Sequence, residues 1–233
     1  MEIAQMINKT PEKAISKRLV LGCGALVHDM LALIKQNPVL QEAITLHCLP
    51  AKLHTTPQLI APEVDRFLAK HSHKYDDIFV AYADCGTVGE LDKVLEKYQA
   101  QRMPGAHCYE FFSGVDTYQD MVDEEVGSFF LTDYLVKNFD RLVVKGLGLD
   151  RFPELFDEYF KHYKRMIYIA QTQDPKLQQL AAQHAQSFGL EYVYRYVGIQ
   201  GLSPMLDAAP NSKFAVEVMH NNTKKAEIVN VSS

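Results

Sequence analysis

The chain has 233 residues, of which 47% are hydrophobic and 23% charged, so it can bury a core without disulfide or metal cross-links. Its formal net charge of −5 provides none of the basic surface that nucleic-acid-binding proteins use. No apolar run is long enough to span a bilayer, and residues 1–18 lack the apolar core of a signal peptide. We therefore expect a cytoplasmic protein with neither a nucleic-acid nor a membrane partner.

The first two structural units each join a short apolar run to a helical pattern. Residues 18–22 predict a buried strand that ends in glycine, and apolar residues at helical spacing follow over 25–34. Residues 43–46 predict a second strand, which ends before the proline-containing sequence at 48–50. After a loop, Pro62 suits the first position of a second helix.

The third unit has the clearest pattern. Residues 77–82 predict a strand and residues 84–86 a turn. Thr87 and Glu90 have the spacing of a capping box, so we expect the next helix to begin at Thr87. A fourth strand candidate, 102–107, contains proline and predicts either an edge strand or an extended loop.

The second half of the chain continues the alternation. Residues 129–139 predict an amphipathic helix, and residues 152–163 predict another. A strand is expected over 166–170. Asp174 followed by proline predicts a helix start, with the helix running to about residue 188. Residues 191–197 form the last expected strand.

Alternating strands and helices predict an α/β fold, with a mostly parallel sheet and helices on both faces. Because the strand–cysteine–helix plan recurs, an arrangement of two similar lobes is an open alternative to a single sheet. We expect this domain to span residues 18–210, after an extension over 1–17 and before a polar tail over 211–233.

All four cysteines lie in the first half of the chain, and three share one kind of position. Cys23, Cys48 and Cys85 each come just after a predicted strand, and Cys108 follows the weaker fourth candidate. In a reducing compartment they are free thiols, metal ligands or catalytic groups rather than disulfides. The carboxyl ends of parallel strands meet at one edge of a sheet, where ligands bind. Together with His54 these thiols suit zinc or an iron–sulfur cluster.

Further residues near the cysteines complete the candidate site. His54 and Glu110 are candidate acid–base groups. Candidate substrate-binding positions flank the cysteines: Gly24, Gly86, Thr87 and His107. Helix N-termini after Cys23 and Cys85 are expected to lower the pKa of these thiols. The cysteine spacing matches no ferredoxin or zinc-ribbon pattern, so a metal site has to be assembled by the fold. A single cysteine is more often a small core residue, and only the shared strand-end position of several cysteines favours a functional site.

Four segments together carry a resemblance to a known family: Gly22-Cys23-Gly24-Ala25, Leu49-Pro50-Ala51-Lys52-Leu53-His54, Tyr82-Ala83-Asp84-Cys85-Gly86-Thr87 and His107-Cys108-Tyr109-Glu110. Over about residues 18–207 the chain is similar to the family catalogued as domain of unknown function 1638. Members of that family often occur beside genes for corrinoid-dependent methyltransferases and one-carbon metabolism. The resemblance thus implies a role in methyl-group metabolism, with corrinoid or methyltransferase proteins as partners.

The resemblance also implies which residues matter. The family's cysteines match Cys23, Cys85 and Cys108, and its histidine matches His54. The chain departs from the pattern at His107, which adjoins the cysteine instead of preceding it by two positions. Cys48 is not a general feature of the family, so it is either an additional ligand or a packing residue.

Three functions are compatible with these observations. In the first, Cys23, Cys85 and Cys108 bind zinc or an iron–sulfur cluster, with Cys48, His54 or a small-molecule substrate in the remaining position. In the second, the protein is a metal-free transferase in which Cys85 is the nucleophile and His54 assists. In the third, the protein is a non-catalytic binding or chaperone module for a corrinoid methyl-transfer system.

Overall fold

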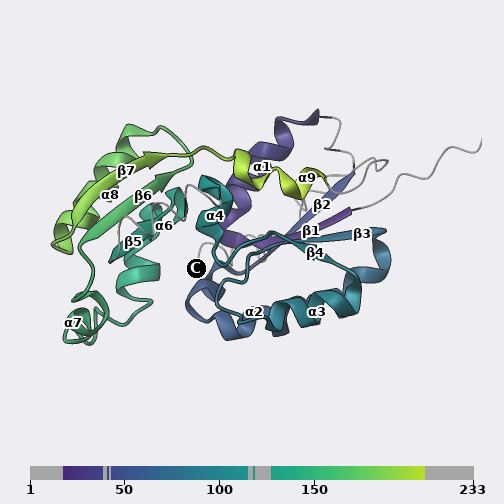
Figure 1. The fold of residues 1–233 in the computed structure, drawn as a ribbon, viewed down its shortest axis with the longest axis horizontal. Coiled ribbons are helices and arrows are strands. Elements are labelled where there is room, and N and C mark those ends of the chain that lie inside the picture. Colours follow the sequence, from purple (N-terminus) through teal and green to yellow (C-terminus); the bar gives the residue numbers. More distant parts are fainter. Residues whose placement is uncertain (1–17, 39–40, 42, 115–117, 119–126, 208–233) are drawn as a thin grey trace, which may run out of the picture.

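The computed structural model describes residues 18–38, 41, 43–114, 118 and 127–207 (Figure 1). The extension expected over 1–17 and the tail expected over 211–233 lie outside the described residues. The described part forms two parallel sheets with helices packed on them, which confirms the α/β fold class. No helix in this part is both long and apolar enough to cross a membrane.

The first sheet contains the strands of the first half of the chain. Its members are β1 (Arg18–Cys23), β2 (Ile44–Leu49), β3 (Asp77–Ala81) and β4 (Gln101–Arg102). All pair in parallel, in the order β2-β1-β3-β4. The fourth strand is only two residues long, because the proline-containing sequence after it continues as a loop.

Helices cover both faces of this sheet. Figure 1 shows α1 (Val27–Lys35) on one side, and α2 (Ile60–His71) and α3 (Glu90–Tyr98) on the other. The period-two alternation of a strand explains this arrangement. In β1, Val20 packs into the core beneath α1, whereas Leu19 and Leu21 pack into the core beneath α2 and α3.

The second sheet is built from the second half of the chain. It contains β5 (Ser128–Leu131), β6 (Arg165–Ala170) and β7 (Glu191–Tyr196), in that order and all parallel. Its helices are α6 (Asp133–Lys137), the π-helical turn η6 (Asp140–Val144), α7 (Leu155–Phe160) and α8 (Pro175–Ser187). The strands thus form two separate sheets, one in each lobe, rather than a single sheet.

The prediction of one amphipathic helix over 129–139 is wrong. The first part of that segment is β5, in which Phe129 pairs with Met166 of β6, and only the second part is helical. Thr132 separates the two, because its hydroxyl accepts a hydrogen bond from the Leu135 N–H at 3.4 Å and caps α6. A short apolar run has no period of its own, so pairing with β6 decides its structure.

The capping box expected at Thr87 is also absent. Helix α3 begins at Glu90, after Gly89 in the left-handed region at φ +79°. The Thr87 hydroxyl instead donates to the carboxylate of Asp84 at 2.9 Å. The cap expected at Asp174 is confirmed, since its carboxylate accepts from the Lys176 N–H at 2.8 Å.

The two lobes share one core. A single cluster of buried side chains includes Val20 and Phe79 of the first sheet and Ile167 of the second. Three short elements pack next to these sheets: α4 (Cys108–Ser113) contacts β6, the 3₁₀ turn η7 (Gln200–Leu202) contacts α4 and α1, and α9 (Pro204–Asp207) contacts β3. A Cβ atom at Gly201 would lie 1.2 Å from the Phe111 carbonyl oxygen, so this contact between η7 and α4 requires glycine.

Candidate functional site

A cavity of about 310 Å³ opens where β1 and β3 end. Three of the four cysteines line it, from three separate segments: Cys23 at the end of β1, Cys85 in the loop after β3, and Cys108 at the start of α4. The remaining lining residues are Ala25, Leu26, His54, Ile60, Ala81, Tyr82, Gly86, His107 and Tyr109. The convergence of Cys23, Cys85, Cys108, His54 and His107 follows from the parallel sheet, which brings strand ends to one edge.

Backbone hydrogen bonds hold the Cys85 loop beside the segment that precedes Cys108. The Asp84 N–H donates to the Gly105 carbonyl at 3.1 Å, and the Cys85 N–H donates to the Ala106 carbonyl at 2.8 Å. Cys85 itself has φ +49°, in the left-handed region that non-glycine residues rarely adopt. These bonds stabilise the unusual backbone and place the two thiols against one cavity.

Asp84 shapes the turn after Cys85. Its carboxylate accepts hydrogen bonds from the Thr87 hydroxyl at 2.9 Å, the Val88 N–H at 3.1 Å and the Gly89 N–H at 2.8 Å. Burial raises the pKa of Asp84, but the donors outweigh it and the net pKa is lowered. Thr87, a candidate substrate contact, therefore supports the turn and does not line the cavity, whereas Gly86 does.

Glu110, a candidate acid–base group, serves the start of α4. Its side chain is buried, and its Oε1 accepts from the Ala106 N–H at 3.0 Å and the His107 N–H at 3.2 Å. These bonds orient the backbone just before Cys108 and cap the helix. Glu110 is absent from the cavity lining, as is the candidate substrate contact Gly24, which is buried in the 3₁₀ turn η1 (Gly24–Leu26).

The family can be assigned once these segments are located. The family described as "Protein of unknown function (DUF1638)" matches residues 48–206. The chain belongs to this family. The match includes Cys85, Cys108 and His54, while Cys23 lies N-terminal to it. No curated protein and no solved structure matches this DUF1638 chain.

Burial dominates the ionisation of the cavity thiols in this DUF1638 protein. It raises the pKa of Cys85 to about 12, with a further contribution from Cys23. The pKa values of Cys23 and Cys108 are raised for the same first reason. The expected lowering by helix N-termini is therefore wrong, because η1 is a single 3₁₀ turn and α3 begins only at Glu90. In the metal-free protein the thiols are neutral at neutral pH.

Two histidines lie at the rim of the cavity. His54 comes from the 3₁₀ turn η3 (Ala51–Thr55), and His107 immediately precedes α4. Both have solvent-exposed surface while also lining the cavity. Desolvation by the surrounding protein, and secondly the charge of His107, lower the pKa of His54. Its imidazole is therefore neutral at neutral pH. A neutral imidazole can act as a base or as a metal ligand.

Tyr82 is a cavity residue that we did not single out from the sequence. It is only 2% exposed, and its hydroxyl makes no hydrogen bond with a nitrogen or oxygen atom of the described residues. The Cys23 thiol lies beside it and is a cause of its raised pKa, after burial. Buried hydroxyls normally have a hydrogen-bond partner. Because this one lacks a nitrogen or oxygen partner and belongs to a residue that lines the cavity, it is a candidate contact for a polar group of a ligand.

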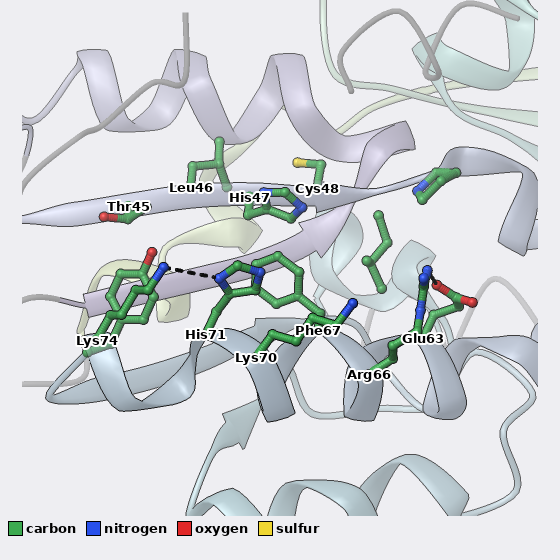
Figure 2. A pocket seen from close by; sticks show the side chains of 13 residues that line it. Thr45, Leu46, His47, Cys48, Glu63, Arg66, Phe67, Lys70, His71 and Lys74 are labelled. Carbon is green, nitrogen blue, oxygen red and sulfur yellow. Dashed lines mark hydrogen bonds and ion pairs between the residues drawn. The ribbon is translucent and has the colours of Figure 1, made fainter. Parts of the chain in front are cut away.

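Cys48 does not join the other three cysteines in the cavity. The strand β2 extends to Leu49, so Cys48 lies within it rather than beyond its end. Cys48 pairs with Gly22, the residue before Cys23, across β2 and β1. Its pKa is raised by burial first and by Cys23 second. Cys48 is among the residues of β2 that line a different cavity, between β2 and α2, but Figure 2 shows its sulfur on the face of β2 opposite α2.

The second lobe approaches the thiol cavity from the side of α6. Tyr134 at the start of α6 has a pKa raised mainly by burial, with a small contribution from Cys23. Arg141 donates a hydrogen bond to the Tyr134 hydroxyl at 3.0 Å. The rings of Tyr109 and Phe130 lie 5.5 Å apart, across from α4 to β5. The cavity is therefore next to the boundary between the two lobes.

A carboxyl pair lies at the same boundary and gives a testable pH dependence. Burial, and secondly the charge of Asp133, raise the pKa of Asp29 to about 7, with Lys137 opposing. Because the folded chain holds this proton more tightly than the unfolded chain, the stability from protonated Asp29 is full below about pH 4 and is lost as pH rises through about 7. We expect Asp29→Asn to raise the melting temperature at pH 8 and to leave it nearly unchanged at pH 4.5.

Thermal unfolding followed by circular dichroism across this pH range measures the effect. Asp157→Asn, at an exposed position of α7, is the matched control and should melt like the parent protein at every pH. Parallel pH profiles for Asp29→Asn and the parent would contradict the assignment.

Proposed function

We propose that this protein holds a thiolate-ligated metal centre, either zinc or an iron–sulfur cluster, and presents it to a small molecule. Cys23, Cys85 and Cys108 are the proposed ligands. The observation that carries the proposal is that these three thiols, from three distant segments, line one cavity of about 310 Å³. Thiolates are the preferred protein ligands of both kinds of centre.

The donor set fits such a centre in chemical type. Among the residues that the structure describes, no group of three or more His, Cys, Asp or Glu side chains is already arranged at coordinating positions. The cysteine side chains would have to rotate toward a common point, which each can do about its Cα–Cβ bond. Three protein ligands leave a fourth position for His54 or for a substrate atom.

The electrostatics of the cavity favour a metal over a free nucleophile. Burial raises the pKa of Cys23, Cys85 and Cys108, and repulsion from neighbouring thiolates raises it further at Cys85 and Cys108, so the thiols stay protonated. A divalent cation offsets both penalties, since it replaces the protons and compensates the thiolate charges. A centre of this kind supplies Lewis acidity or electron transfer when bound. The chain's own residues position it: the Asp84 turn holds Cys85, and Glu110 orients the start of α4.

The cavity also has room and polarity for a small molecule. Most of its lining is apolar or thiol, while Tyr82 offers a buried hydroxyl and His54 a neutral imidazole at the rim. We propose that the ligand is a one-carbon or methyl-transfer compound, and that a corrinoid or methyltransferase protein is a partner. This assignment depends on the family resemblance and not on the geometry of the cavity.

Anaerobic reconstitution tests the metal centre. Protein purified without oxygen is incubated with zinc, or with iron and sulfide, desalted, and analysed by elemental analysis and by visible absorption. We expect close to one zinc ion or one cluster for each chain. Protein that retains neither metal after desalting, and whose spectrum does not change, would overturn the proposal.

Alkylation separates this function from that of a metal-free cysteine transferase. Because burial raises the pKa of Cys85 to about 12, we expect metal-free protein to react slowly with iodoacetamide at neutral pH. The rate should still be rising above pH 9, since the thiolate is the reactive species. Mass spectrometry of the modified cysteines gives the rate at each site. A single fast-reacting thiol at Cys85 at neutral pH would favour the transferase instead.

A further inference from the structure

A second cavity, of about 460 Å³, lies at the β2 edge of the first sheet, between β2 and α2 (Figure 2). One of its walls is the strand β2, from which consecutive residues line the cavity. The opposite wall is α2 with the 3₁₀ turn η5 (Ser72–Lys74) that continues it. The result is an elongated groove between a strand and a helix, and it is separate from the thiol cavity.

The strand wall presents open backbone groups. In the described part of the chain β2 is the last strand on its side of the sheet. The Arg18 N–H donates to the Ala43 carbonyl at 3.1 Å, and this fixes which residues face β1. Backbone groups alternate in direction along a strand, so those of Leu46 and Cys48 face away from β1 and toward the groove. An incoming strand could pair with them.

The helix wall is cationic. Arg66, Lys70 and Lys74 line the groove at intervals of four residues. Glu63 is the only carboxylate among the lining residues, and it forms an ion pair with Arg66. The protein as a whole carries a formal charge of −5, so this row of cations is a local departure. Because opposite charges attract across an interface, it fits an acidic partner.

The spacing of the cations matches that of an extended peptide. Figure 2 shows α2 running alongside β2. Four residues of helix rise about 6 Å, and alternate residues of a strand are about 6.6 Å apart. Side chains on one face of an added strand would therefore meet Arg66, Lys70 and Lys74 in turn. Stacked rings of His47 and Phe67, with centroids 4.2 Å apart, form the floor between the two walls.

We propose that this groove binds an extended acidic peptide segment of a partner protein, which adds to the sheet as a strand next to β2. Main-chain hydrogen bonds to Leu46 and Cys48 would supply affinity, as in other cases of strand addition. Acidic side chains at alternate positions would meet the cations of α2 and supply specificity. The groove is an interaction surface, so this inference goes beyond the metal centre and can be tested without metal.

The binding test uses labelled peptides of about eight residues, long enough to pair along β2. The probe alternates Glu and Val, and a reference peptide has Lys in place of Glu. We expect fluorescence anisotropy to show saturable binding of the acidic probe and none of the basic one. Lys70→Glu combined with Lys74→Glu should weaken binding about tenfold or more. Lys164→Glu with Lys176→Glu, at exposed sites of the second lobe, makes the same charge change and should leave binding unaltered.

Two further probes test whether the peptide binds as a strand. One carries N-methyl groups on its Glu residues and the other on its Val residues. Strand pairing uses only one of these alternate sets, so we expect one methylated probe to lose binding and the other to keep it. Amide hydrogen exchange of Leu46 and Cys48 should slow when the unmethylated probe is bound. Equal binding of both methylated probes, or absence of binding by the acidic probe, would overturn the proposal.

Discussion

Alanine at Cys23, Cys85 or Cys108 is expected to abolish stoichiometric metal loading, whereas alanine at Cys48 leaves loading unchanged. The three proposed ligands line one cavity, and Cys48 is not among the residues that line it. Outer-shell partners alone are worth about 10–100-fold in metal affinity, so removal of a thiolate ligand should exceed that. Reconstitution followed by elemental analysis and visible spectroscopy measures the loss.

The Cys48→Ala variant is a demanding control. Cys48 is also a thiol, is also largely buried, and lies close enough to Cys23 that Cys23 raises the pKa of Cys48. A non-specific thiol effect would therefore affect all four variants alike. Loss of metal on substitution of Cys48, with retention on substitution of Cys85, would contradict the ligand set. Circular dichroism confirms folding of each variant before loading.

Asp133→Ala is expected to lower the free energy of unfolding by about 3–5 kcal/mol. Asp133 is 4% exposed, and its carboxylate joins the ends of β5 and β6. It accepts hydrogen bonds from the Tyr168 hydroxyl at 2.6 Å, the Gln171 N–H at 2.9 Å, and the Thr172 N–H and hydroxyl at 3.1 and 2.5 Å. Alanine would leave the buried Tyr168 hydroxyl and Gln171 N–H without an acceptor, which costs more than the bonds contribute.

Denaturant unfolding at neutral pH measures this change. Tyr168→Phe removes only one of the donors and should cost about 1–2 kcal/mol. Asp133→Asn keeps one acceptor oxygen and should lie between the two. A loss below about 1 kcal/mol for Asp133→Ala would show that the carboxylate does not hold the ends of β5 and β6 together.

Local patterns predicted most of the first sheet and misplaced particular boundaries. The strands expected over 18–22 and 77–82 are present as β1 and β3, because apolar runs that end in turn residues suit parallel strands buried on both faces. The segment 129–139 was misassigned, since a short aromatic run suits a strand or a helix equally and the pairing partner β6 is distant in sequence. Thr87 does not cap a helix, because the Asp84 carboxylate accepts hydrogen bonds from the Thr87 hydroxyl and from the Gly89 N–H in the same turn.

The candidate site shows the same division. Position next to a strand end was enough to bring Cys23 and Cys85 to one cavity, whereas Cys108 reaches it from the start of α4. His54 and His107 reach it from η3 and from the loop before α4. Strand-end position was not enough for Cys48, because β2 runs further than its apolar residues indicate. The sequence did not indicate that Tyr82 lines the cavity, because a single aromatic residue at the end of a predicted strand is common. It also did not indicate that the Glu110 carboxylate caps α4.

The sequence alone determined the α/β class, the family resemblance and the positions of Cys23 and Cys85 next to strand ends, because these depend on residue order and on local periodicity. The tertiary structure decided which thiols share a cavity, and that their pKa values are raised rather than lowered. It also decided that β2 and α2 enclose a cationic groove. These properties depend on burial and on contacts between segments far apart in the chain, and such contacts exist only after the strands have paired.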